Sequence, residues 1–150
     1  MTSQMECAAI SPHNVLGLRG AERARTGVML EELIAKIQAV LTPDLLKRPY
    51  REENAENPMF GHCYVATEAL FHLLPDRENY CACRGRDDRG IVHWWLVHKP
   101  TGQIYDVTAD QYHSKGLVPP YARGKRSGFL TKDPSKRCRM LLGRMRRFSS

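Results

Sequence analysis

Cys63 is the residue whose type and position point most directly to chemistry. It falls in the segment Gly61-His62-Cys63-Tyr64, where a stretch with helical spacing of apolar residues begins. Unpaired backbone N–H groups and the helix dipole stabilise an anion at the first turn of a helix, so this position favours the thiolate form of cysteine. The same N–H groups can bind the oxyanion of a tetrahedral intermediate. Glycine at 61 would permit a tight turn and leave space beside the sulfur, although buried structural cysteines are also common on helices.

His93 and Asp106 are expected to lie close together on neighbouring strands. β-branched and aromatic residues predict a strand over 91–98, and a second strand over 103–107 follows the turn at 99–102. If that turn is a four-residue hairpin loop, His93 and Asp106 become diagonal neighbours on one face, about 7 Å apart at the backbone. A carboxylate there can hold the imidazole in the tautomer whose other nitrogen accepts a thiol proton. A loop one residue longer or shorter would turn Asp106 away, so the prediction depends on turn length.

Two further polar residues are candidates for supporting roles. Asp110 is the rival carboxylate, but it lies past the predicted strand, where capping a turn is the simpler role. Asn57 precedes Cys63 by six residues. Its amide can supply a second oxyanion donor, or it can be an ordinary turn residue.

Four residues are candidates for substrate binding. Trp94 and Trp95 point to opposite faces of their strand, so one is expected in the core while the other can border the site. Tyr64 and Gln111 are further candidates for lining the pocket.

The pair Cys81-x-Cys83 could bind metal together with His62 or His98. A single C-x-C without a second cysteine pair lacks the usual ligand spacing. Alternation places both cysteines on one strand face, where packing explains them. The sequence therefore predicts no metal site.

Sequence motifs around these residues resemble a known superfamily. The run HWWLVHKPTGQIYDVT, residues 93–108, resembles the His–Asp motif of the transglutaminase-like branch of the papain-like superfamily. Gly61-x-Cys63 at the start of a helix resembles the nucleophile motif of that superfamily, and the order Cys, His, Asp is the same. The stretch 57–130 also resembles small uncharacterised bacterial and phage proteins.

The resemblance implies an α+β fold in which a nucleophile helix packs on a small antiparallel sheet with flanking helices. It also implies a thiol hydrolase or acyltransferase of the protease, deamidase or amidase type. Its triad would be Cys63, His93 and Asp106, without a cofactor, and its substrate a protein, a peptide or a small amide. Asn57 stands where papain-like enzymes carry an oxyanion glutamine. The interval of 30 residues between Cys63 and His93 is shorter than in larger members.

The elements that must position these residues follow from apolar spacing and from turn residues. Residues 1–26 are predicted to form a loosely structured arm, and residues 27–150 a single catalytic domain. The elements expected in that domain are helices over 28–41, 43–46 and 62–74, a loop over 47–58, strands over 79–84, 91–98 and 103–107, and a terminal helix after Asp133-Pro134. This order indicates an α+β plan.

Composition and charge limit the class of protein. No apolar run is long enough to cross a bilayer and no secretory signal is evident, so we expect a cytoplasmic protein with free thiols. Ten Lys and Arg against one Asp give residues 123–150 a charge of +9, and the rest of the chain sums to −2. This basic end suggests an anionic partner, either nucleic acid or an acidic protein, bound by a non-catalytic module. A solvated helix face explains the same charges.

Overall fold

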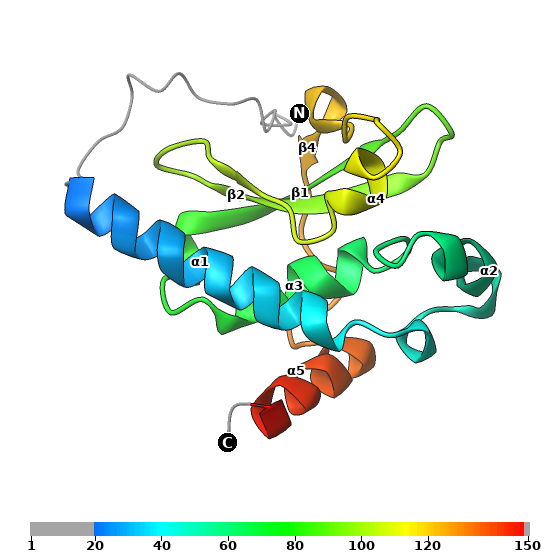
Figure 1. Ribbon diagram of the computed structural model, residues 1–150. Helices are drawn as coiled ribbons and strands as arrows, with labels where there is room; N and C mark the ends of the chain where they lie inside the picture. Colours follow the sequence, from blue (N-terminus) through cyan, green and yellow to red (C-terminus); the bar gives the residue numbers. More distant parts are fainter. Residues whose placement is uncertain (1–19, 149–150) are drawn as a thin grey trace.

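The computed structural model describes residues 20–148, which form an α+β arrangement of helices and one antiparallel sheet (Figure 1). This confirms the predicted general class, α+β. The α-helices are α1 (Gly20–Val40), α2 (Arg48–Glu56), α3 (Cys63–Leu73), α4 (Asp110–His113) and α5 (Lys136–Phe148). The strands are β1 (Tyr80–Arg86), β2 (Val92–His98), β3 (Ile104–Tyr105) and β4 (Lys125–Arg126). Of the helices described, none is long and apolar enough to cross a membrane.

The sheet has the strand order β3-β2-β1-β4, and its register confirms the predicted hairpin. Leu96 pairs with Tyr105 and Val97 with Ile104. The His98 N–H donates to the Gln103 oxygen at 2.9 Å, so the loop between these two paired residues has four residues and ends at Gly102, whose φ of 73° suits glycine. β3 is shorter than predicted because the chain turns at Asp106, whose Oδ1 accepts a hydrogen bond of 3.1 Å from the Thr108 N–H.

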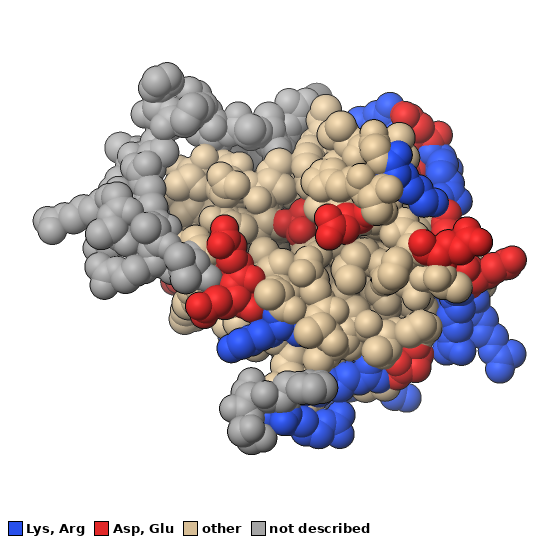
Figure 2. All heavy atoms as spheres, in the orientation of Figure 1, with Lys and Arg blue, Asp and Glu red and all other residues tan. Residues whose placement is uncertain are grey.

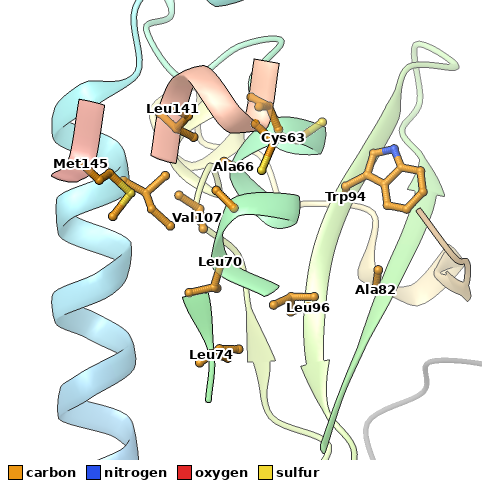
Figure 3. Close-up of a cluster of buried hydrophobic side chains, with 14 of the residues drawn as sticks. Cys63, Ala66, Leu70, Leu74, Ala82, Trp94, Leu96, Val107, Leu141 and Met145 are labelled. Carbon is orange, nitrogen blue, oxygen red and sulfur yellow. The ribbon is translucent and has the colours of Figure 1, made fainter. Parts of the chain in front are cut away.

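Two apolar clusters lie on the two faces of the sheet. The larger one joins β2 to helices α1, α3 and α5, and it includes Trp94 and Leu96 of β2 (Figure 3). The smaller one contains Trp95 and Val97, which alternate with them along the strand. Trp94 and Trp95 therefore face opposite ways, as predicted.

Helix α2 corrects the prediction of a loop over residues 47–58. Its two prolines lie where helices tolerate them: Pro49 is in the first turn and Pro58 follows the last. Helix α1 begins at Gly20, so residues 20–26 are helical although the sequence predicted an arm there. The remainder of the predicted arm, residues 1–19, lies outside the described residues.

Helix α5 is fixed to α3 by a buried carboxylate. Glu68 of α3 is fully buried and accepts hydrogen bonds from the Ser135 N–H at 2.9 Å and the Ser135 hydroxyl at 2.6 Å. Ser135 precedes the helix, where unpaired N–H groups favour a negative charge. Helix α3 and the basic helix α5 are thus joined by packing and by a buried polar contact.

Candidate active site

His93, near the start of β2, forms a buried pair with Asp106, which directly follows β3. The Nε2 atom of His93 lies 2.6 Å from Oδ2 of Asp106. The side chain of His93 is 0% exposed and that of Asp106 is 3% exposed. The register of β2 and β3 brings them together, because it sets Asp106 immediately beyond the last paired residue of β3.

Asp106 is held from two more directions. The hydroxyl of Tyr121 donates to Oδ2 at 2.8 Å, and the backbone N–H of Thr108 donates to Oδ1. A carboxyl group with three hydrogen-bond partners is fixed in orientation. It can therefore set both the tautomer and the angle of the His93 ring.

Cys63 is the first residue of α3 and lies beside the His93 ring. Its Sγ is 3.7 Å from the carbonyl oxygen of Val92, the residue before His93, and Cys63 is 8% exposed. Burial disfavours the imidazolium, but the Asp106 carboxylate and the neighbouring Cys63 outweigh this effect and raise the pKa of His93 from 6.5 to about 9. Cys63 and His93 are thus close enough to interact electrostatically.

The ring nitrogen that Asp106 does not use is Nδ1. It is buried and has no hydrogen-bond partner among residues 20–148. Cys63 influences the ring charge without forming a well-aligned hydrogen bond, and such contacts often tighten only when substrate binds. Nδ1 is therefore the atom available for proton exchange with the sulfur.

Gly61 shapes the chain entering α3. Its φ is +84°, and a Cβ built there would lie 2.9 Å from Leu46 Cδ2 and 3.2 Å from Tyr50 Cβ. Glycine is required at this point for the turn, as predicted, and also for close packing, which was not predicted. The space it leaves is filled by Leu46 and Tyr50; the sequence had suggested room beside the sulfur.

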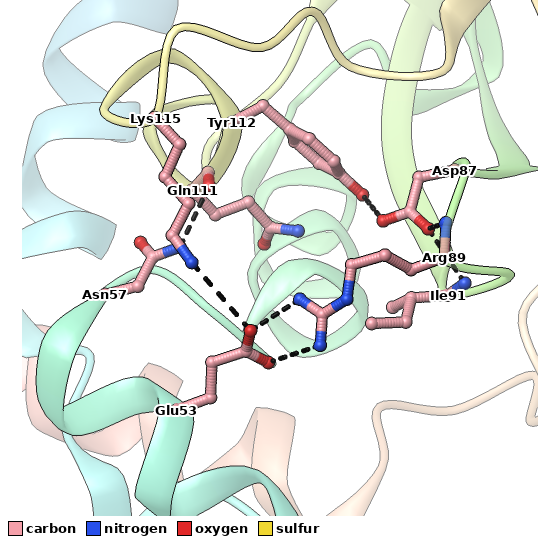
Figure 4. A network of polar contacts seen from close by, with 8 residues as sticks. All are labelled: Glu53, Asn57, Asp87, Arg89, Ile91, Gln111, Tyr112 and Lys115. Atoms are coloured by element: carbon pink, nitrogen blue, oxygen red, sulfur yellow. Dashed lines mark hydrogen bonds and ion pairs between the residues drawn. The ribbon is translucent and has the colours of Figure 1, made fainter.

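Asn57 and Gln111 contact each other in a network that links α2 to α4 (Figure 4). The Nδ2 atom of Asn57 donates to the backbone oxygen of Gln111 at 2.9 Å, and both residues are buried. One amide hydrogen of Asn57 is engaged by this bond and the other is not. The Oε1 atom of Gln111 is buried and has no hydrogen-bond partner in the described part of the chain.

Tyr64 and Trp94 belong to an aromatic group beside α3. Their rings meet edge to face at 4.9 Å, and Trp94 stacks on Phe129 at 5.9 Å. The Tyr64 hydroxyl accepts a hydrogen bond of 2.9 Å from the Leu130 N–H. Trp94 is buried, whereas Tyr64 is partly exposed at the edge of this group.

Trp95 lies on the side of His93 and Asp106. It is fully buried between His93, at 5.8 Å between ring centroids, and Tyr121, at 5.1 Å. A Cβ at Gly124 would come within 2.3 Å of its ring. Trp95 is therefore fully enclosed and packs behind the His93–Asp106 pair.

Asp110 and the cysteine pair lie outside this arrangement. Asp110 is exposed and begins α4, but the N-cap residue is Ala109 and no side chain caps the helix, so the expected capping role is not confirmed. Cys81 and Cys83 belong to the smaller apolar cluster, and Cys83 is disulfide-bonded, which corrects the expectation that the thiols are free. Within residues 20–148, no group of three or more His, Cys, Asp or Glu side chains could hold a metal ion.

Two residues of the site were not identified from the sequence. Tyr121 binds Asp106, and Tyr112 packs its ring edge to face against His93 with centroids 4.9 Å apart. Both come from segments that follow β3, in which no periodic pattern indicates a buried aromatic residue. Only the tertiary structure reveals them.

Comparisons with known proteins do not assign the chain to a family. No protein-family model, no curated protein and no solved structure matches it. The site must therefore be interpreted from its own geometry.

Proposed function

We propose that this protein is a thiol hydrolase or acyltransferase with a papain-like or transglutaminase-like core, acting on an amide or isopeptide bond. The observation that carries the proposal is the buried His93–Asp106 pair, at 2.6 Å, beside a cysteine that begins a helix. Nucleophile, base and orienting acid are the three parts that this chemistry requires.

The raised pKa of His93 defines the starting state. With a pKa of about 9, the imidazole is protonated at neutral pH, beside the Asp106 carboxyl group and the Cys63 sulfur. The thiolate is the reactive form of cysteine, and the N-terminus of α3 stabilises it.

The reaction follows from these roles. The Cys63 sulfur attacks the carbonyl carbon, and a C–S bond forms as the carbonyl π electrons move to oxygen. His93 Nδ1 gives its proton to the leaving amine, so the C–N bond breaks and an acyl-enzyme remains. Water or a second amine then attacks the acyl carbon, losing its proton to His93, and the sulfur leaves as thiolate. The choice of water or amine decides between hydrolysis and transfer.

The oxyanion is stabilised by N–H groups at the start of α3. A helix leaves its first N–H groups without intrahelical partners, and that of Cys63 lies next to the reacting sulfur. The Asn57 amide retains one hydrogen beyond its bond to Gln111 and supplies a second donor. No cofactor takes part in this scheme.

Iodoacetamide labelling across pH 5–9, read by peptide mass spectrometry, tests the proposal. Cys63 should be alkylated well below pH 8, and His93→Ala should slow this by about tenfold or more at pH 6. Cys81 and Cys138 are internal controls, because burial raises the pKa of both thiols, that of Cys138 to about 12 with the help of Glu68. If Cys63 reacts no faster than these two, the proposal is wrong.

A second candidate function uses the basic surface of α5. Figure 2 shows Lys and Arg side chains gathered over this helix. Lys132 lies just before the helix and is exposed, as are five basic residues of α5: Lys136, Arg137, Arg139, Arg146 and Arg147. Such a surface would bind nucleic acid or an acidic protein in a strongly salt-dependent way. Binding of a fluorescent oligonucleotide at 50 and 200 mM salt tests it, with Arg137→Glu/Arg139→Glu as the variant. Affinity that does not change in this variant contradicts it.

A further inference from the structure

A pocket lies beside Tyr112, whose ring also packs against His93. It has a volume of about 330 Å³ and is formed by the turn after β1 and by residues 117–123. This volume falls within the range of small-ligand sites. Its lining includes Asp87, Tyr112, Leu117, Val118, Pro119 and Arg123.

Tyr112 is shared by the pocket and the candidate active site. Its ring packs against His93, while its hydroxyl donates to Asp87 Oδ2 at 2.9 Å on the pocket side (Figure 4). Burial, assisted by Asp87, strongly raises the pKa of Tyr112, so the phenol stays neutral. On this side a single aromatic ring separates the pocket from the catalytic imidazole.

The charged groups of the pocket are already paired within the protein. Arg123 Nη2 lies 2.6 Å from Asp88 Oδ1, and Arg89 Nη1 lies 2.5 Å from Glu53 Oε1. Asp87 Oδ1 accepts from the N–H groups of Arg89 and Ile91. The pocket therefore offers a ligand no unpaired carboxylate or guanidinium among these residues.

What the pocket offers is apolar surface. Leu117 is 54% exposed and Val118 80% exposed, whereas the two prolines that follow are buried. Proline fixes φ, so this wall is stiff. Two adjacent aliphatic side chains are therefore exposed to water beside a stiff wall. Burying them against an apolar group of a ligand is favourable.

We propose that this pocket is the subsite that binds an apolar side chain of a peptide substrate, next to the amide bond that Cys63 attacks. The inference rests on the proposed thiol chemistry. A substrate must reach both the pocket and the sulfur, which flank Tyr112 and His93, so the ligand is an extended peptide segment and not an isolated small amide. Because the charged groups around the pocket are already paired within the protein, we expect the pocket to prefer Leu or Phe over Asp or Lys.

The test uses peptidyl vinyl sulfones that differ only in one side chain (Leu, Phe, Gly, Asp or Lys), with the rate of Cys63 adduct formation measured by mass spectrometry. The vinyl carbon bonds to the sulfur and the adjacent carbanion takes the His93 proton, so no co-reactant is needed. We expect the Leu and Phe probes to react about tenfold faster than the others, or more. Val118→Asp and Leu117→Asp should remove this preference, whereas Met140→Asp, an exposed apolar residue of α5, should retain it.

Iodoacetamide separates the two ways in which the experiment can fail. It requires only the activated thiol, so its rate at Cys63 should be the same in all three aspartate variants. If the iodoacetamide rate is normal but the probes react equally, or the preference survives in Val118→Asp and Leu117→Asp, the subsite is wrong while the thiol chemistry stands. If Cys63 shows no His93-dependent reactivity toward iodoacetamide, the proposed function fails and the subsite with it.

Discussion

The hydroxyl of Tyr121 binds the same oxygen of Asp106 that pairs with His93. The two contacts to Oδ2 are 2.8 Å from Tyr121 and 2.6 Å from His93 Nε2. Tyr121 precedes the segment that forms β4, the strand at the opposite edge of the sheet from β3. The carboxylate is therefore held by a residue from outside its own hairpin. This relationship leads to the first prediction.

Tyr121→Phe should lower the free energy of unfolding by about 1.5–3 kcal/mol, because a buried carboxylate loses a donor. Urea unfolding followed by circular dichroism measures it. Tyr50→Phe is the matched control, since Tyr50 is exposed and its replacement should change stability by less than about 0.5 kcal/mol. Equal stability of the two variants would show that the Tyr121 contact does not stabilise the fold.

The raised pKa of His93 predicts a loss of stability at alkaline pH. The folded protein holds the imidazolium up to about pH 9, while the unfolded chain releases that proton near pH 6.5. The stabilisation is therefore fully present below pH 6.5 and is lost as pH rises through 9. Urea unfolding at intervals from pH 6 to 9.5 should show this decline, and His93→Gln should flatten it. An identical pH dependence in that variant would contradict the assignment.

His62 predicts the opposite dependence at acidic pH. Both of its ring nitrogens are buried and have no hydrogen-bond partner among residues 20–148, and burial lowers its pKa to about 4. His62 binds a proton near pH 6.5 in the unfolded chain but only near pH 4 in the folded protein. The free energy of unfolding therefore falls as pH drops through this window. His62→Phe should reduce the loss between pH 7 and 4.5, whereas His113→Phe, at an exposed position, should not. Thermal unfolding at the two pH values tests whether the variants differ.

Gly61→Ala should destabilise the protein by about 1–3 kcal/mol, through the left-handed backbone and contact with Leu46. Gly90→Ala isolates the backbone effect, because Gly90 has a φ of +77° but nothing within 4 Å of a built Cβ. We expect Gly61→Ala to be the more damaging in urea unfolding and also to slow Cys63 alkylation. If both variants lose the same stability, packing against Leu46 is not important.

The sequence was sufficient to predict the part of the site that depends on local rules. Alternation along β2 and the length of one loop placed Asp106 beside His93, and the glycine-led helix start placed Cys63 at an N-terminus. The loop predicted over 47–58 is wrong, because its prolines fall at permitted positions of α2. Local rules treat proline as a breaker, but they do not distinguish its position within a helix.

The rest of the site depends on contacts between segments far apart in the chain. Tyr121 reaches Asp106 across the sheet, and β4 pairs with β1 over only two residues, too short to leave a periodic pattern. Trp95 fits only because Gly85 and Gly124 approach its ring. Such relationships are set by tertiary packing and have no signal in the spacing of residues.

The bond between Glu68 and Ser135 limits how the basic end of the chain can be studied. Shortening the protein before Ser135 would remove two hydrogen-bond donors from the buried Glu68 carboxyl group, in the helix that begins with Cys63. A buried charge left unpaired in this way costs about 3–5 kcal/mol. A truncated protein that lost thiol reactivity would report a damaged interior and would reveal nothing about the arginines. Charge reversal on the outer face of the intact chain is the experiment that keeps the two questions apart.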